Sequence, residues 1–474
     1  MSTDPSAARR GTPDPRMPVR ASRVLSVPVV WLAPLAVASF VVAIIAALYI
    51  SSVINPTSQL RGLPVGVVNQ DNGATIGSWH LNIGQQVQGG LLASPKVSGP
   101  LRLELSTLRQ AQRATGSDNL YAMLVIPPDF TASLLSVAGL PVAGPGAGTA
   151  PHVQILTNQR AGLQGATLAT EILQQALMKA SPMIGKQLAA LSPAGSRTAA
   201  TRALLASPVA VMTTQFRPLP PNTALGSSAF YVSLLTIMCG FLGGIIVSTM
   251  VDSVLGYAST EIGPRRRQRR PLPINRWQTL LIKWSVITTI TAVLTAVLLV
   301  VAWAVGMDEP HPFLLWAYAW LCAACVGIAM IVLLAAAGLA GQLLGLLLFV
   351  YGGLASAGGV VPEQALPGPL RTLSNVEPLR QTVGGVRSIL YFNAQADAGL
   401  ARGALVAALS LVFWLVVGTV IVKWYDHKGL YRLQPDFLSH VRKSLDDYDA
   451  RQAGPSPAPP ADGQSPGGEA GPPS

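Results

Sequence analysis

Fifty-three consecutive residues, from Pro310 to Pro362, contain no Asp, Glu, Lys or Arg. A membrane-spanning helix needs about 20 predominantly apolar residues, so this stretch is long enough for two such helices. The sequence "GLAG", Gly338 to Gly341, supplies a tight turn between them. The stretch therefore predicts a helical hairpin within a bilayer, and it restricts the chain to folds built around membrane-spanning helices.

Four further charge-free stretches bring the predicted number of spans to six. The chain is 50% hydrophobic and only 11% charged, whereas soluble domains are about 25% charged. A cleavable signal peptide is the alternative for the first stretch, but the apolar core from Val29 to Ile50 exceeds the roughly 7–15 residues of a signal peptide. We therefore predict an uncleaved anchor, and spans at about residues 28–54, 226–252, 281–306, 313–337, 341–361 and 403–423.

The positions of the charges predict the orientation. Arginines crowd the tail 1–27 and the segment "GPRRRQRRPLPINR", whereas Asp308 and Glu309 follow the third span. Basic residues collect on the cytoplasmic side, so we predict a multi-pass plasma-membrane protein with both termini cytoplasmic. The tail 426–474 is then cytoplasmic, and its Pro- and Gly-rich part from about residue 453 is expected to be disordered. One segment opposes this orientation, because Pro362–Arg402 is predicted to lie outside and holds four arginines, Arg371, Arg380, Arg387 and Arg402.

Residues 55–221, between the first two spans, follow the pattern of a soluble domain. Short apolar runs that end in turn residues alternate with helical segments, which predicts a small extracytoplasmic α/β domain. Because these elements have apolar faces of their own, we expect the domain to fold by itself. The predicted strands are Val65–Val68, Leu101–Leu105, "YAMLVI" and "HVQILTN", and the main predicted helices are Ser78–Leu92 and Gly162–Leu188.

The sequence gives no support for catalysis, a metal or a cofactor. It contains no phosphate-binding loop GxxxxGK[ST] and no HExxH, and the five histidines are scattered. Asn69, Asp71 and Gly73 faintly resemble a calcium loop that lacks its bidentate Glu, so Asp71 is interpreted as a turn former or helix cap. We predict that the chain is not an enzyme and uses no cofactor.

Other charged or reactive residues have structural interpretations. Cys322 and Cys325 form a CxxC inside a predicted span and are interpreted as small core residues. The net charge of +12 lies beside the spans without any nucleic-acid-binding signature, so nucleic acid is not an expected partner. Asp252 and Lys283 lie near cytoplasmic ends of spans, where long side chains reach the membrane surface.

Several motifs in their order along the chain resemble a known family. One span is followed by "LPVGVVNQDNG" and "YAMLVIPPDF", then by "PPNTALGSSAFYVSLLTIMCGFL" and "LPGPLRTLSNVEPLRQTVGGVRSILYF". This arrangement resembles the ABC-2-type permease superfamily, in particular the branch of phage-infection (Pip-like) proteins and nitrosoguanidine-resistance membrane proteins. The resemblance implies one helix, an inserted outer domain and five further helices, which is a polytopic α-helical membrane protein of 1+5 spans with an extracytoplasmic α/β domain.

The resemblance implies an export permease for a hydrophobic, drug-like or cell-envelope compound, powered by a separate ATPase. A non-transporting scaffold for envelope or secretion machinery is the alternative. The expected partners are membrane lipids, an ATPase subunit and a second copy of the chain. The family's cytoplasmic segment matches "EIGPRRRQRRPLPINRWQTLLIKW", although an Arg run replaces the family's Thr-Leu positions. This segment is predicted to contact either anionic lipid or the ATPase through Glu261, Gly263, Arg265, Arg266, Arg267, Arg269, Arg270, Pro273 and Lys283.

Overall fold

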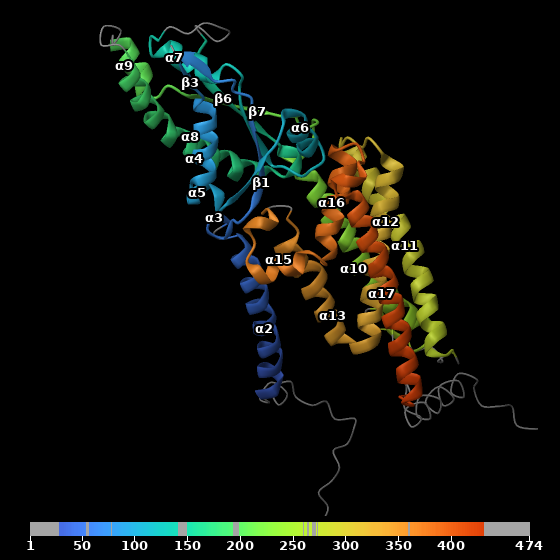
Figure 1. The fold of residues 1–474 in the computed structure, drawn as a ribbon. Helices are drawn as coiled ribbons and strands as arrows, with labels where there is room; N and C mark the ends of the chain where they lie inside the picture. The colour runs from blue at the N-terminus through green and yellow to red at the C-terminus, as the bar shows by residue number, and fades with distance from the viewer. Residues whose placement is uncertain are drawn as a thin grey trace, which may run out of the picture.

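The computed structural model shows a helical bundle joined to a smaller α/β region (Figure 1). It describes residues 28–53, 56–76, 78–140, 149–192, 199–258, 260–262, 265–267, 272, 274–358 and 361–430. The chain begins with helix α2 (Pro28–Val53), which stands beside the bundle and contacts η4 and α14. The rest of the chain divides into the α/β region and the bundle, with a connecting segment between them.

A five-stranded mixed sheet forms the centre of the α/β region. Its strand order is β4-β1-β5-β6-β7. Strands β4, β1 and β5 are parallel, β6 runs antiparallel to β5, and β7 pairs parallel with β6. Strand β1 is buried along six of its seven residues, as is typical of a strand covered on both faces. The strands are β1 (Leu63–Asn69), β4 (Leu101–Leu105), β5 (Ala122–Ile126), β6 (His152–Thr157) and β7 (Ala210–Gln215).

Helices connect and cover these strands. The predicted helix Ser78–Leu92 was wrong in its first turn, because β2 (Ala74–Ile76) and β3 (Trp79–Leu81) form an antiparallel hairpin there. The helix begins only after Asn82, whose side-chain oxygen accepts a hydrogen bond from the Gln85 backbone N–H. The helices of this region are α3 (Pro56–Gln59), α4 (Ile83–Ala93), α5 (Pro95–Ser98), α6 (Leu108–Gly116), α7 (Phe130–Val137), η1 (Gln159–Ala161), α8 (Leu163–Leu191) and α9 (Ala199–Ala206).

Asp71, at the end of β1, is a helix cap, as predicted. Its carboxylate accepts hydrogen bonds from the backbone N–H groups of Gly84 in α4 (2.9 Å) and Thr131 in α7 (3.1 Å). Helix N-termini carry unsatisfied N–H groups and partial positive charge, which a carboxylate satisfies. Gly84 is required by this contact, because a Cβ there would lie 2.6 Å from the Asp71 Cβ.

Five helices of the described part are long and apolar enough to cross a membrane. They correspond to the five predicted spans that follow the α/β region. The first predicted span coincides with α2, several of whose side chains fall outside the described part, so a sixth span stays a prediction. The five are α10 (Ser228–Val254), α11 (Arg276–Ala304), α12 (Pro312–Ala337), the composite helix Leu339–Ser356 and α17 (Leu400–His427).

Close backbone approach holds the centre of the bundle together. A Cβ on Gly240 of α10 would lie 2.4 Å from the Ala323 carbonyl oxygen of α12. A Cβ on Gly244, one turn later, would lie 2.9 Å from the Gly327 carbonyl oxygen. Small residues permit such contact between membrane helices. The composite helix consists of α13 (Leu339–Gly345), the π-helical η4 (Leu346–Gly352) and α14 (Gly353–Ser356), and the turn at Gly338 (φ 55°) separates it from α12.

The connecting segment, residues 361–399, joins the two parts of the molecule. Val361, Leu366 and Leu370 are buried in the same hydrophobic cluster as Leu63 and Val65 of strand β1. Helix α16 packs in turn against α10, α12 and α17. The α/β region and this segment therefore lie at the same end of the bundle (Figure 1). The segment's elements are η5 (Glu363–Ala365), α15 (Gly368–Ser374), α16 (Pro378–Tyr391) and η6 (Ala396–Ala398).

Candidate functional site

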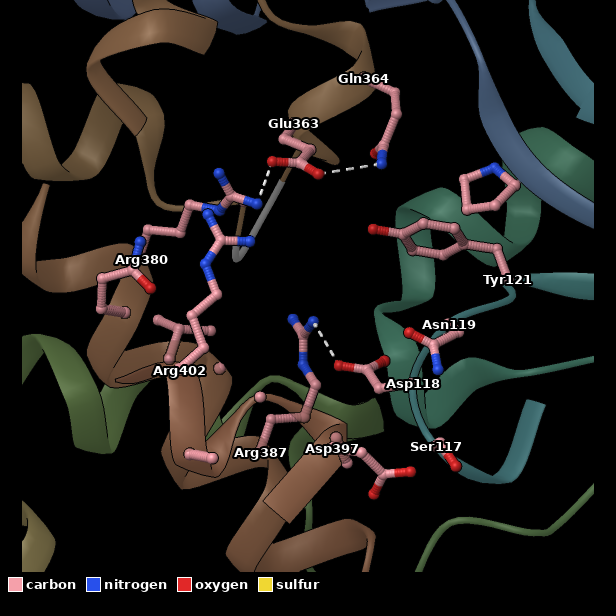
Figure 2. Close-up of a pocket in the computed structure, with 18 of the residues that line it drawn as sticks. Ser117, Asp118, Asn119, Tyr121, Glu363, Gln364, Arg380, Arg387, Asp397 and Arg402 are labelled. Atoms are coloured by element: carbon pink, nitrogen blue, oxygen red, sulfur yellow. Dashed lines mark hydrogen bonds and ion pairs between the residues drawn. The ribbon is translucent and has the colours of Figure 1, made fainter. Parts of the chain in front are cut away.

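A charged cavity of about 560 Å³ lies where the α/β region meets the connecting segment and the start of α17. Ligand pockets typically measure about 300–1,000 Å³. Four arginines and three carboxylates are among the residues that line it. Figure 2 shows six of these side chains around the space, with Asp118 from the α/β region and the others from the connecting segment and α17: Glu363, Arg380, Arg387, Asp397 and Arg402. The arginines are Arg102, Arg380, Arg387 and Arg402, and the carboxylates are Asp118, Glu363 and Asp397.

Asp118 and Arg387 form an ion pair across the junction. An Asp118 carboxylate oxygen lies 3.7 Å from Arg387 Nη1, with the two side chains 15% and 11% exposed. Asp118 follows α6 with φ of 60°, in the left-handed conformation that commonly ends a helix. Burial raises the pKa of the Asp118 carboxyl to about 7, against the opposing effect of Arg387. The pair therefore connects the α/β region to α16 and changes its charge near neutral pH.

Helix α16 presents the arginines because of how it begins. Glu377, 1% exposed, accepts hydrogen bonds from the backbone N–H groups of Leu379 and Arg380, both at 2.9 Å. Burial raises the pKa of the Glu377 carboxyl to about 7, while these bonds lower it. From this cap, Arg380, Gly384 and Arg387 follow at helical spacing i, i+4 and i+7, so all three line the cavity from one face.

The opposite face of α16 fixes it to the bundle. A Cβ on Gly385 would lie 2.2 Å from the Tyr318 ring of α12, so only glycine allows this approach. The Tyr318 hydroxyl donates a hydrogen bond of 2.7 Å to the Gln381 carbonyl oxygen. Helix α16 therefore packs closely against α12, while its arginines line the cavity.

Polar partners orient the remaining cavity residues. Arg380 forms an ion pair with Glu363 and donates to Ser374 Oγ at 3.0 Å. Arg402, in the first turn of α17, is exposed and donates to the Asn375 side-chain oxygen at 3.3 Å. The Tyr121 hydroxyl points into the cavity from the α/β region (Figure 2), and burial raises the pKa of that hydroxyl.

Comparison with known proteins identifies a family. The family described as "Protein of unknown function (DUF3533)" matches residues 33–420. The chain belongs to this DUF3533 family. No curated protein matches the chain.

One solved structure is similar to a part of this DUF3533 chain. It is described as a "domain of a putative ABC type-2 transporter from Thermotoga maritima MSB8". It shares 17% sequence identity and covers 32% of this chain and 84% of its own, with a TM-score of 0.20. A TM-score this low carries no information on a shared fold.

In this DUF3533 chain, the predicted docking segment is a short hairpin at the other end of the bundle. Strand β8 (Thr260–Ile262) pairs antiparallel with β9 (Arg265–Arg267), with Glu261 opposite Arg266. The structure thus brings Glu261 together with the first three arginines of the run, at the level of the backbone. Gly263, Arg269, Arg270 and Pro273 lie outside the described residues.

Lys283, the last residue of the predicted docking segment, is buried against helix α10. It is 5% exposed, and its Nζ lies 2.9 Å from an Asp252 carboxylate oxygen and 2.9 Å from Ser248 Oγ. This pair ties α11 to α10 close to the hairpin. The interpretation that both side chains reach for the membrane surface was therefore wrong, because each satisfies the other inside the bundle.

The cavity was not predicted from the sequence, although a signal for it was present. Residues 362–402 carry four arginines in a segment predicted to be outside, contrary to the usual charge bias. Arg380 and Arg387 stand seven residues apart after a Glu-Pro helix start. Arginines that lie on the side where they are not expected, and that recur at helical spacing, indicate a binding or structural role instead of a role in fixing membrane orientation.

Among the described residues, no cluster of three or more His, Cys, Asp or Glu side chains is placed to hold a metal ion.

Proposed function

We propose that this protein is the permease subunit of an export system of the ABC-2 type, acting on a hydrophobic, drug-like or cell-envelope compound. The observation that carries the proposal is the junction itself. Five apolar helices are fixed, through residues 361–399, to an α/β region with a charged cavity at the contact. The motif order that resembles ABC-2 permeases supports the same function. The proposal assigns no catalytic step to this chain.

The proposed arrangement places the protein in the plasma membrane with six spans. Helix α2 would be the first, because Pro28–Val53 contains no charged residue and its apolar side chains face outward, with Phe40 65% exposed. The α/β region would be extracytoplasmic and both termini cytoplasmic. Arg387 agrees with this orientation, since its ion pair with Asp118 of the α/β region would explain its presence on that side.

The energy would come from a separate ATPase that contacts the cytoplasmic segment from Glu261 to Arg276. Arginine forks pair well with carboxylates on a partner. The Lys283–Asp252 pair supports this role, because it links α10 and α11 next to β8 and β9 and would transmit movement of the hairpin to both helices. A homodimer is proposed as the functional unit, because the outward faces of α11 and α17 are largely exposed.

Charge reversal in the hairpin tests the proposal. Replacement of Arg266, Arg267 and Arg269 by Glu should abolish export and co-purification of an ATPase, whereas Gln at the same positions should reduce them less. Reversal can also flip topology. Single cysteines at Ser117 and Gln268, in a chain without native cysteines, should therefore label oppositely with an impermeant maleimide in every variant. Parental export by a correctly oriented Glu variant would reject the docking role.

A non-transporting scaffold is the second candidate, favoured by the tight packing of α10 against α12 at Gly240 and Gly244. Deletion of the protein separates the two functions. A permease predicts lost efflux, and a scaffold predicts unchanged efflux with failed envelope assembly.

A further inference from the structure

Three guanidinium groups converge on one side of the cavity, and two of them form ion pairs with a carboxylate. Arg380 is paired with Glu363 and Arg387 with Asp118, whereas Arg402, within the described part of the chain, donates to the neutral side chain of Asn375. Figure 2 shows the Arg380 and Arg402 guanidinium groups next to each other, on the side opposite Tyr121. The residues that line the cavity include four arginines and three carboxylates, Asp118, Glu363 and Asp397, so the lining carries one positive charge in excess when all are ionised.

The surroundings raise the electrostatic cost of this arrangement. The whole residue Arg387 is 9% exposed, and its Nε has no hydrogen-bond partner among the described residues. Burial lowers the pKa of Arg380; Glu363 opposes this effect, while the charges of Arg402 and Arg387 add to it. Like charges held close together in a partly desolvated site repel strongly, and a bound anion would relieve the repulsion.

Residues with further hydrogen-bond donors line the same space. Gly399 and Ala401, at the N-terminus of α17, line the cavity beside Arg402. The first N–H groups of a helix have no intrahelical acceptor and carry partial positive charge. The side-chain amide of Asn119 lines the opposite wall (Figure 2). The lining of the cavity therefore combines arginine guanidinium groups, residues with backbone N–H donors and neutral polar side chains.

We propose that this cavity binds a phosphate group, and that the group belongs to the head of an anionic amphiphile. A tetrahedral phosphate accepts hydrogen bonds from several guanidinium forks at once, whereas a single carboxylate fills one fork. A volume of about 560 Å³ holds a headgroup and not the chains of a lipid. The site lies at the first turn of α17, a membrane-spanning candidate, where the head of a bilayer molecule would emerge.

The phosphate-binding inference stands on the cavity alone, and only the role of the ligand as exported cargo rests on the proposed function. Free inorganic phosphate offers the same chemistry as a lipid head. The raised pKa of Asp118, about 7, supports the inference at neutral pH. When Asp118 is protonated it no longer neutralises Arg387, whose guanidinium group can then contact the phosphate.

Binding to the purified full-length protein in neutral detergent tests the proposal. Calorimetric titrations would use sodium phosphate, dihexanoyl phosphatidic acid and dihexanoyl phosphatidylcholine. We expect the phosphatidic acid to bind, and Arg402→Gln to weaken binding roughly tenfold, the loss of one charge-assisted hydrogen bond. Arg202→Gln, an equal charge change on the exposed α9 residue Arg202, is the matched control and should bind like the parent.

The arms distinguish the sources of the phosphate. Inorganic phosphate that binds and competes with phosphatidic acid would show that the head alone is recognised, and phosphate binding without lipid binding would assign the site to the free anion. No binding by either compound, or equal binding by the parent and Arg402→Gln, would overturn the proposal. A melting temperature of Arg402→Gln equal to that of the parent excludes misfolding as the cause of lost binding.

Failure of this inference can be told apart from failure of the transport proposal. The titration involves no ATPase and no transport. Normal phosphate binding by a protein whose deletion leaves efflux unchanged would reject the transport function alone. Normal export with no phosphate binding would reject this site alone.

Discussion

Two groups of arginines lie at opposite ends of the bundle and are presented differently. Arg265–Arg267 are consecutive, in a three-residue strand of a hairpin that follows α10. Arg380 and Arg387 stand two turns apart on α16, with acids supplied by other segments. Asp118, the partner of Arg387, is more than 250 residues away in the sequence. A run of consecutive arginines is easy to see in a sequence. Arginines at helical spacing are harder to see, but they lie on one face of a helix and can therefore line one site.

The largest effect is expected from Arg387→Ala. Above pH 7, where Asp118 is ionised, removing one member of this buried ion pair leaves the other charge uncompensated, at a cost of about 3 kcal/mol. The protein should therefore unfold at a clearly lower temperature in detergent. The double variant Asp118→Asn/Arg387→Gln should recover much of the loss, because no charge is left unpaired. A single variant as stable as the parent would show that the pair does not hold the junction.

A smaller effect is expected from Arg380→Gln, which removes the contacts with Glu363 and Ser374. Both partners of that ion pair are partly exposed, so we expect a loss of about 1–2 kcal/mol in the free energy of unfolding. Arg402→Gln is the comparison, since exposed Arg402 makes one hydrogen bond to an amide. If the two variants lost equal stability, Arg380 would not be the better-anchored of the two.

The pH dependence of stability should report Asp118. Its pKa rises from an ordinary value of 3.8 to about 7 in the folded protein. Between these values the folded state holds a proton that the unfolded state has lost, so its contribution to stability falls as pH rises from about 4 to about 7. Melting temperatures of Asp118→Asn measured across this range should decline less than those of the parent. Parallel curves would contradict the assignment.

The smallest effect is expected at the other arginine group. Arg266→Gln should change the free energy of unfolding by less than about 0.5 kcal/mol, as for ordinary surface substitutions. The same thermal unfolding measurement, alongside Arg380→Gln, sharpens the comparison between the two groups. A loss as large as that of Arg380→Gln would mean that the hairpin arginines are packed within the protein too.

The sequence predicted the elements whose signal is carried by their own residues. The uncharged stretches gave the five spans of the bundle, and the apolar run of β1 gave a central strand. Strand β7 was missed, because it is an edge strand with mostly exposed residues and shows no apolar alternation. The hairpin of β2 and β3 was missed because two three-residue strands are too short for any period to show.

The site depends on contacts that no local pattern encodes. In the sequence, Glu377 before Pro378 is an ordinary helix start. Its burial follows only from the packing of α14 and α16 around it. A Cβ on Gly353 of α14 would lie 2.7 Å from the Glu377 carboxylate. Lys283 and Asp252 were correctly placed near span ends, but their pairing required the relative rotation of two helices. Such pairings are tertiary contacts. A sequence therefore shows which charged residues need a partner but not which residue the partner is.

The burial of Leu366 and Leu370 in the hydrophobic cluster of the α/β region also sets the order in which the protein can mature during its synthesis. The last strand of the sheet ends at Gln215, and residue 361 leaves the ribosome nearly 150 residues later. At roughly 5–20 residues per second, the sheet waits on the order of ten seconds with part of its apolar surface uncovered. Four membrane helices are made in that interval. A fragment that ends at Arg217 would keep this surface uncovered, so the nascent sheet would complete its apolar contacts only when the chain's own later residues arrive.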